Sequence, residues 1–244
     1  MVGRQAIGGS PEVVFFDLAT TVPGRFGEGF QLLDFGAIVV CPRRLTELES
    51  YCTLVRPEGP FRRPPAAGCR GGITGDAVVA APTFREVAEE IFWILDGRIW
   101  CGHNIRRFHC VRLREAFAGI GQAPPLAAGV MDSQCALSAR FGWRAGDMKM
   151  ATLAAYFGIG RQNHRSLEDA RMNLEVVKHC AMVLLLESSL PGILDGKRLV
   201  SPGAITTRSR SGVRRPDNQE TSRKSPPVWP AYRRTVPYVR KQPH

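Results

Sequence analysis

The segment that most constrains the fold is Val13–Phe16, a run of four β-branched or aromatic residues. Apolar residues on both faces are typical of a strand buried in the centre of a sheet. The run ends at Asp17, and a carboxylate at the end of a central strand is costly unless it is solvated or bound. Asp17 therefore either begins a loop, as many aspartates do, or belongs to a binding site.

Four further segments have strand patterns. Leu32–Cys41 is apolar and β-branched, and Ser50–Arg56 alternates as a strand nearer an edge does. Together with Val13–Phe16 they predict an antiparallel meander. Ile99–Cys101 and Val130–Met131 are shorter, and a helical pattern follows each of them. A meander followed by alternating strands and helices predicts an α/β domain with a mixed five-stranded sheet flanked by helices.

Three of the predicted helices have apolar residues at intervals of three and four, which marks one buried face on each. The first follows Thr83 and ends at Gly97, a usual stop signal. The second follows Asn104, which can act as its N-cap. The third should pack across the sheet. Their predicted core residues are, in order, Phe84, Val87, Ala88, Ile91 and Leu95; Phe108, Val111, Ala116 and Ile120; and Leu167, Ala170, Leu174, Val177, Ala181 and Leu184.

Two shorter helices and a long loop complete the predicted domain. One helix follows Asp132 or Ser133 as its cap, and the other spans Met148–Phe157. Pro57–Pro82 is rich in Pro, Gly and Arg and is expected to be a loop. A loop of this length in a compact domain is either functional or disordered.

Polar residues that can bind ions or substrates lie next to several of these elements. His103-Asn104 follows a predicted strand, and His164 and Asp169 stand at the start of the last helix. Each has a structural alternative. Ser166–Asp169 fits a capping box, so Asp169 could serve only the helix N-terminus, and His164 could be an ordinary polar residue before a helix.

The order of these residues resembles the motifs of the DEDDh family of 3′–5′ exonucleases, which has a ribonuclease H-like fold. That family has Asp-x-Glu on its first strand, an Asp after His-Asn, and His-x4-Asp at its last helix. The matching positions in this chain are Asp17, His103-Asn104, His164 and Asp169.

Two positions depart from the family pattern. Ala19 stands where the first motif has Glu, and His109 stands where the second has Asp. The chain resembles in particular the plant exonuclease-domain proteins of the NEN type. The segments that carry this likeness are Cys41–Arg43, Arg98–Phe108 and Met148–Met150.

The resemblance implies binding of single-stranded DNA or RNA and hydrolysis with Mg²⁺ or Mn²⁺. Asp17 would bind both metal ions, Asp169 would bind the first, and His164 would take the proton from the attacking water. The Gly72-Ile73-Thr74 segment resembles one that the family places near the substrate. The residues implied to contact substrate are Leu18, Ala19, Thr20, His103 and Asn104.

The two departures bear directly on this chemistry. Two Mg²⁺ ions about 3.5–4 Å apart repel each other unless several carboxylates neutralise them. With Ala19 and His109 the four carboxylates become two, so metal binding should be weakened. His109 could be a ligand of Mn²⁺ or Zn²⁺, although a role outside the ligand set is favoured.

Two hypotheses about function follow. In the first, the chain is a pseudoenzyme of the family that binds single-stranded nucleic acid with lost or strongly reduced hydrolysis. In the second, it is an active metal-dependent 3′–5′ exonuclease that relies on Asp17, His164 and Asp169. DNA or RNA preference and protein partners do not follow from these residues.

The two ends of the chain differ in composition from the predicted domain, which spans residues 12–190. Residues 1–11 are expected to be a flexible N-terminus. Residues 201–244 hold ten Lys and Arg against two acids, a net +8 of the chain's +11, and have the composition of a disordered basic, Pro-rich tail. This tail could contact nucleic acid, direct nuclear import, or be simply solvated.

Cysteine usage and hydropathy favour a protein of the cytosol or nucleus. The seven cysteines show no paired spacing, which indicates free, mostly buried thiols in a reducing compartment. Residues 1–10 lack the features of a signal peptide. The longest aliphatic stretch, Ala181–Leu186, is too short to span a bilayer, so no membrane interaction is expected.

Overall fold

The computed structural model describes residues 11–23, 29–58 and 73–194, with side chains as far as residue 191. The expectations for the flexible N-terminus, for Gly72 and for the basic tail concern residues outside these ranges. No helix in the part of the chain that the structure describes is both long and apolar enough to cross a membrane.

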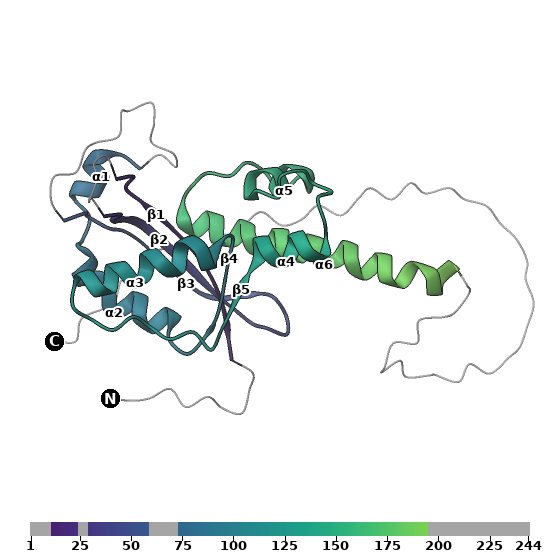
Figure 1. The fold of residues 1–244 in the computed structure, drawn as a ribbon, viewed down its shortest axis with the longest axis horizontal. Coiled ribbons are helices and arrows are strands. Elements are labelled where there is room, and N and C mark those ends of the chain that lie inside the picture. The colour runs from purple at the N-terminus through teal and green to yellow at the C-terminus, as the bar shows by residue number, and fades with distance from the viewer. Residues whose placement is uncertain (1–10, 24–28, 59–72, 195–244) are drawn as a thin grey trace, which may run out of the picture. The chain divides into compact units, whose positions relative to one another are not determined.

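Five strands form one mixed sheet in the order β3-β2-β1-β4-β5 (Figure 1). The central strand β1 (Val13–Thr20) pairs antiparallel with β2 (Leu32–Val40) and parallel with β4 (Ile99–Gly102). The edge strands are β3 (Glu47–Leu54), antiparallel to β2, and β5 (Gly129–Asp132), parallel to β4. The predicted α/β architecture is therefore confirmed, including the meander and the edge position of the third strand.

Helices lie on both sides of this sheet. A π-helical turn, η2, leads directly into α3, and α6 is the longest helix by far. The helices are α1 (Gly75–Val79), α2 (Phe84–Leu95), η2 (Ile105–His109), α3 (Cys110–Gly119), α4 (Ser133–Arg140), α5 (Met150–Tyr156) and α6 (Ser166–Leu194).

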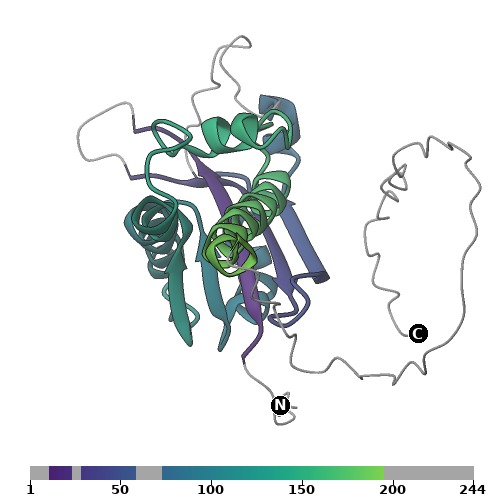
Figure 2. The same ribbon diagram turned by 90° about the vertical axis from the view of Figure 1, so that its right-hand side faces the viewer.

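The two faces of the sheet have different helical partners. Phe16 and Leu18 of β1 pack with residues of α2 and α3 in one hydrophobic cluster. Phe15, the residue before Phe16, packs instead with Ala170 and Leu174 of α6. In Figure 2, α6 is the long green helix that lies in front of the strands. β1 thus separates two cores, and its side chains alternate between them.

Several expectations about α2 and its surroundings are confirmed. All five predicted core residues of α2 are buried. The helix ends at Leu95, and Gly97 follows with a φ of 70°. Asp132 caps α4 as predicted, because its Oδ1 accepts hydrogen bonds from the backbone N–H groups of Gln134 and Cys135.

The predicted core face of α3 is correct only in part: Ile120 is buried and Phe108 and Ala116 pack against the core, but three of the buried positions were not predicted. The buried residues of this segment are Cys110, Leu113, Phe117 and Ile120, whereas Val111 and Ala116 are half-buried. The reason is η2, because a π-helical turn contains an extra residue and rotates the face of everything that follows it. The sequence pattern alone gives no sign of this turn.

Smaller corrections concern caps, a loop and the cysteines. The Asn104 side chain makes no capping hydrogen bond, and α1 interrupts the segment expected to be a loop. Ala181 is exposed rather than part of the α6 core face. The six cysteines within the described ranges are all free, as predicted, but Cys52 and Cys135 are exposed.

Candidate functional site

Asp17 lies on the face of β1 that turns toward α6. It shares this face with Phe15, two residues earlier, and not with the core residues Phe16 and Leu18. β4 pairs with β1 only as far as Phe15. Asp17 therefore lies inside β1, rather than at its end, but beyond the point where the parallel pairing stops.

Two residues of β2 fix the N-terminus of α6 close to Asp17. Asp34 is 1% exposed, and its Oδ2 accepts hydrogen bonds from the Ser166 backbone N–H at 3.0 Å and from Arg165 Nε at 3.2 Å. It satisfies a helix N-terminus from another element. A side chain at Gly36 would overlap the backbone of Leu167, so the glycine allows close packing of helix and strand.

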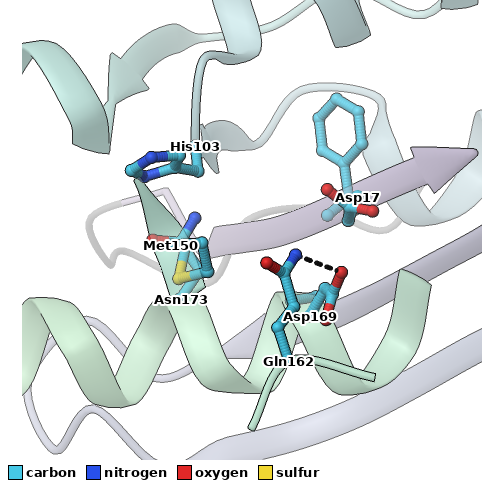
Figure 3. Close-up of a pocket in the computed structure, with 8 residues that line it drawn as sticks. Asp17, His103, Met150, Gln162, Asp169 and Asn173 are labelled. Atoms are coloured by element: carbon cyan, nitrogen blue, oxygen red, sulfur yellow. Dashed lines mark hydrogen bonds between the residues drawn. The ribbon is translucent and has the colours of Figure 1, made fainter. Parts of the chain in front are cut away.

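This docking brings Asp169 to the same cavity as Asp17. The cavity has a volume of about 210 Å³, and its lining includes Asp17, His103, Met150, Gln162, Asp169 and Asn173. Figure 3 shows the two aspartates side by side, one on β1 and one on the first turn of α6. The expected convergence of these two distant residues at one place on the sheet is therefore observed.

The Asp169 carboxylate is only partly satisfied. Its Oδ2 accepts a hydrogen bond from Gln162 Nε2 at 2.7 Å, whereas Oδ1 is buried with no hydrogen-bond partner among the described residues. The capping box that the sequence suggested is not formed, because Ser166 Oγ is also buried without such a partner. Asp169 is thus directed at the cavity rather than used as a local cap.

His109, at the end of η2, also contacts Asp17. Its Nε2 lies 3.4 Å from Asp17 Oδ1, and the His109 side chain is 7% exposed. The imidazole also packs edge-on against the ring of Phe16, with 6.1 Å between the ring centroids. The position where the resemblance implies a carboxylate is thus filled by a buried aromatic ring beside Asp17.

Burial and like charges shift the acid–base behaviour of the site. Burial, followed by the charges of Asp169 and Asp34, raises the pKa of Asp17 well above its usual value. Burial likewise raises the pKa of Asp169, although Gln162 and His164 act in the opposite direction. Burial and the nearby His103 lower the pKa of His109 to about 4, so its imidazole is neutral at pH 7.

A chain of polar contacts holds His103 at the edge of the cavity. Its Nδ1 lies 3.4 Å from Ser133 Oγ, which donates a hydrogen bond to Asn173 Oδ1 at 2.8 Å. His103 Nε2 is buried and has no hydrogen-bond partner within the described ranges. Burial lowers the pKa of His103. The cavity therefore offers a neutral imidazole nitrogen and an amide beside its two carboxylates.

Backbone strain is concentrated around this cavity. Asn104, Met148 and His164 have φ values of 57°, 56° and 55°, in the left-handed region. Only Leu45 shares this conformation among the other non-glycine residues that the structure describes. Such conformations cost roughly 1–3 kcal/mol each and cluster at functional sites. The Met148 backbone partly offsets the effect of burial on the pKa of His103.

The remaining predicted site residues lie at different depths. Leu18 is 3% exposed and belongs to the core on the opposite face of β1. Ala19 and Thr20 are half-buried on β1 beyond Asp17. His164 is half-buried in the segment before α6, and its side chain is not part of the cavity lining.

Sequence reasoning missed three residues that line the cavity: Gln162, Met150 and Asn173. Asn173 could have been found, because it follows Asp169 by four residues and so lies on the same helical face. Gln162 lies in a loop, and Met150 begins α5, so no periodic pattern places either of them.

The donor set does not fit the pair of magnesium ions that the resemblance implies. No group of three or more His, Cys, Asp or Glu side chains is arranged to hold a metal ion in the described part of the chain. The cavity has two carboxylates, and its other polar groups are amides and a neutral imidazole. Mg²⁺ prefers hard, charged oxygen ligands, of which this cavity has few.

Two aspartates converge on the five-stranded mixed sheet from its first strand and its last helix, as the resemblance to a family of exonucleases implies. Residues 14–177 match the RNase T family model, described as exonuclease. The chain belongs to this exonuclease family.

Its relatives include the NEN proteins of Arabidopsis thaliana. It is 57% identical to Protein NEN4 over 199 residues, which cover 82% of this chain and 78% of NEN4. It is 54% identical to Protein NEN3 over 226 residues, which cover 90% of this chain but 44% of NEN3. The chain thus spans less than half of this longer relative.

Solved structures share the ribonuclease H-like exonuclease fold. The nuclease domain of 3′hExo, a DEDDh family member bound to rAMP, has a TM-score of 0.59 at 15% identity, over 78% of this chain and 96% of that one. Escherichia coli Exonuclease I in complex with a dT13 oligonucleotide has a TM-score of 0.57 at 18% identity, over 77% of this chain and 43% of that one. The predicted family and fold are therefore confirmed.

The pKa of His109 leads to a testable pH dependence of stability. Its pKa is about 4 in the folded state against a usual value of 6.5, so its contribution to stability is complete above pH 6.5 and is lost as the pH falls toward 4. The loss should be about 3 kcal/mol, at roughly 1.4 kcal/mol per pKa unit. His109→Gln should remove this part of the pH dependence of the unfolding free energy.

Denaturant titrations at pH 7, 5.5 and 4.5 would measure this pH dependence of the unfolding free energy. Asp17 and Asp169 have raised pKa values, so their contributions change in the opposite direction as the pH falls. The comparison of the parent with His109→Gln therefore isolates the imidazole. His179→Gln, at an exposed position on α6, is the matched control. Equal pH dependence in the parent and His109→Gln would contradict the prediction.

Proposed function

We propose that this chain binds the 3′ end of single-stranded nucleic acid in the cavity between Asp17 and Asp169, and hydrolyses it very slowly or not at all. The observation that carries the proposal is the contact between His109 and Asp17. A buried, neutral imidazole lies 3.4 Å from the carboxylate that would have to bridge two metal ions.

The electrostatics of the cavity support reduced hydrolysis. Two dications separated by about 4 Å require several carboxylates nearby. Ala19 contributes no oxygen atom, and His109 contributes no negative charge. Two carboxylates can hold one hydrated ion at most weakly, so the steps that need both metal ions should slow by orders of magnitude.

The neutral polar groups of the cavity support binding without cutting. Asn173 Oδ1 accepts from Ser133, which leaves its amide N–H groups as donors, and His103 Nε2 is unpaired in the described structure. Such groups can recognise a sugar or base edge. Related structures carry rAMP in one case and a dT13 oligonucleotide in another.

A specific observation favours the alternative, an active metal-dependent exonuclease that uses Asp17, His164 and Asp169. Asp169 Oδ1 is buried and unpartnered within the described residues, and Asp17 and Asp169 repel each other. A single cation between the two carboxylates would give Asp169 Oδ1 a partner and would neutralise the repulsion between Asp17 and Asp169. Mn²⁺ suits this role better than Mg²⁺, because it accepts imidazole ligands more readily.

The two candidates differ in a single assay. A 5′-labelled single strand of DNA or RNA is incubated with the chain in EDTA, Mg²⁺ or Mn²⁺, and both binding and product length are measured. We expect binding in all three conditions and no shortening in Mg²⁺. Shortening from the 3′ end that Asp169→Asn abolishes would establish the active enzyme instead. Absence of binding in every condition would overturn both candidates.

A further inference from the structure

Two aromatic rings and an arginine form a surface cluster next to the candidate site. Phe30, before β2, and Phe108, in η2, pack edge to face with 6.2 Å between their centroids. The guanidinium of Arg112 on α3 lies over the Phe30 ring at 4.0 Å and 5.9 Å from the Phe108 centroid. We call Phe30, Phe108 and Arg112 the aromatic platform.

Arg112 stacks on one face of the Phe30 ring. Its side chain is 18% exposed, and its Nη1 pairs with Glu115 at 2.9 Å. Its Nε is buried without a hydrogen-bond partner among the described residues, so the guanidinium is used for stacking rather than for a full set of hydrogen bonds. Arg112 covers one face of the ring, yet Phe30 remains 37% exposed.

The platform is connected to the candidate site by direct contacts. The Phe108 ring packs edge-on against the imidazole of His109 at 5.5 Å between centroids. His109 in turn lies 3.4 Å from Asp17. Phe30 is therefore two ring contacts away from His109. The platform residues do not line the cavity itself, so a base that stacks on Phe30 would belong to a different nucleotide from the one held between Asp17 and Asp169.

The charge around the platform suits a polyanion. The segment Ile105–Glu115 contains four arginines and one acidic residue, Glu115, which leaves an excess of positive charge. Arg107 is exposed on η2. Arginine next to an exposed aromatic ring is the combination that binds single strands, because the charge attracts phosphates while the ring stacks on a base.

We propose that the aromatic platform stacks on one base of a single-stranded nucleic acid, upstream of the nucleotide in the Asp17–Asp169 cavity. Phe30 makes the contact, and Arg112 is a positioning residue that fixes the ring. The proposal rests on the proposed binding function and adds a second, base-stacking subsite to it. Stacking of this kind tolerates any base, because every base has a π-face.

The test couples a change in the protein to a change in the ligand. Affinities for a single-stranded 12-mer are measured in EDTA for the parent, Phe30→Ala and Phe30→Trp. The 12-mers carry one abasic nucleotide at the first, second, third or fourth position from the 3′ end. Trp93→Ala is the matched control, because Trp93 is an aromatic residue 63% exposed on α2.

We expect Phe30→Ala to weaken binding by roughly tenfold or more, a usual effect of removing one stacked ring, and Phe30→Trp to restore it. An abasic nucleotide at the second or third position should lower the affinity of the parent by the same factor but should not change the affinity of Phe30→Ala. The reason is that the ring and the base form one contact, which either change removes. Trp93→Ala should bind as the parent does.

Three results would overturn the proposal. Binding of the 12-mer by Phe30→Ala as tightly as by the parent would show that the platform does not contribute, while the proposed binding in the cavity would remain supported. Equal losses in Phe30→Ala and Trp93→Ala, or additive effects of ring and base at all four positions, would exclude a stacked base. Absence of binding by the parent to any strand would reject the proposed function together with the platform.

Discussion

Ala19→Glu combined with His109→Asp should raise the rate of 3′-end hydrolysis in Mg²⁺ by at least about a hundredfold, the low end for restoring one positioned catalytic group. The two positions are implied to serve different metal ions of one catalytic unit. Each single substitution should therefore recover little, because the effects of residues that act jointly are far from additive.

The structure supports the placement of both new carboxylates. Ala19 lies two positions after Asp17 on β1, so a longer side chain at position 19 would project from the same face of the strand as Asp17. His109 lies at the end of η2 with its side chain already next to Asp17. The two introduced carboxylates would thus join those of Asp17 and Asp169 around one volume.

The same geometry predicts a cost without metal. Ala19 pairs across the sheet with Asp34, and Asp17 already has a pKa raised by burial and by neighbouring carboxylates. Two added negative charges should lower the melting temperature in EDTA. Mg²⁺ should then raise the melting temperature of the double variant far more than that of the parent, by binding only the folded state.

The controls separate chemistry from folding. His164→Ala in the double variant should abolish hydrolysis while leaving the Mg²⁺-induced thermal shift in place. The decisive measurement is the rate of the parent against the double variant at equal Mg²⁺ concentration. Equal and measurable rates of hydrolysis in both would show that the missing carboxylates are not needed, and the active enzyme would be the correct interpretation.

Gly36→Ala should destabilise the fold by about 3 kcal/mol or more, a large effect for one methyl group. The added Cβ would overlap the backbone of Leu167, which cannot rotate away as a flexible side chain could. Relief requires α6 to move from β2, which would break the Asp34 hydrogen bonds to Arg165 and Ser166. Asp169, on the same helical turn, would move away from Asp17.

Urea denaturation measures the free energy of unfolding, and the affinity for an oligonucleotide reports whether Asp17 and Asp169 still form the cavity. Gly119→Ala is the matched control, because a Cβ there meets no atom within 4 Å and the residue ends α3. It should leave stability unchanged or raise it by up to about 1 kcal/mol. A stability of Gly36→Ala equal to that of the parent would mean that α6 is not seated on β2 as described.

Features of the fold that depend on local pattern could be predicted from the sequence. The buried face of α2 and the positions of the strands follow from residue spacing alone. The buried positions Leu113 and Phe117 of α3 could not be predicted in this way, because the π-helical turn at Ile105–His109 inserts a residue and rotates the helix that follows. Periodicity reports the phase of a helix only when no residue is inserted.

Part of the candidate site could likewise be predicted from the sequence, and part could not. The motif residues Asp17, His103 and Asp169 share the cavity, as their resemblance to a family implied. The role of Asp34 could not be predicted, because its partners Arg165 and Ser166 are more than a hundred residues away in the chain. The aromatic platform likewise could not be predicted, because it joins Phe30, in the segment before β2, to the continuous η2–α3 segment.

The alternation of side chains along β1 has a consequence for how this protein can vary through evolution. Phe16 and Leu18 belong to the core with α2 and α3, whereas Asp17 lines the cavity beside α6. Phe16 and Leu18 contribute to the packing of the core, whereas Asp17 contributes the carboxylate of the cavity. Substitutions at cavity positions can therefore accumulate without loss of the domain, and a lineage can exchange a catalytic role for a binding role while keeping the same architecture.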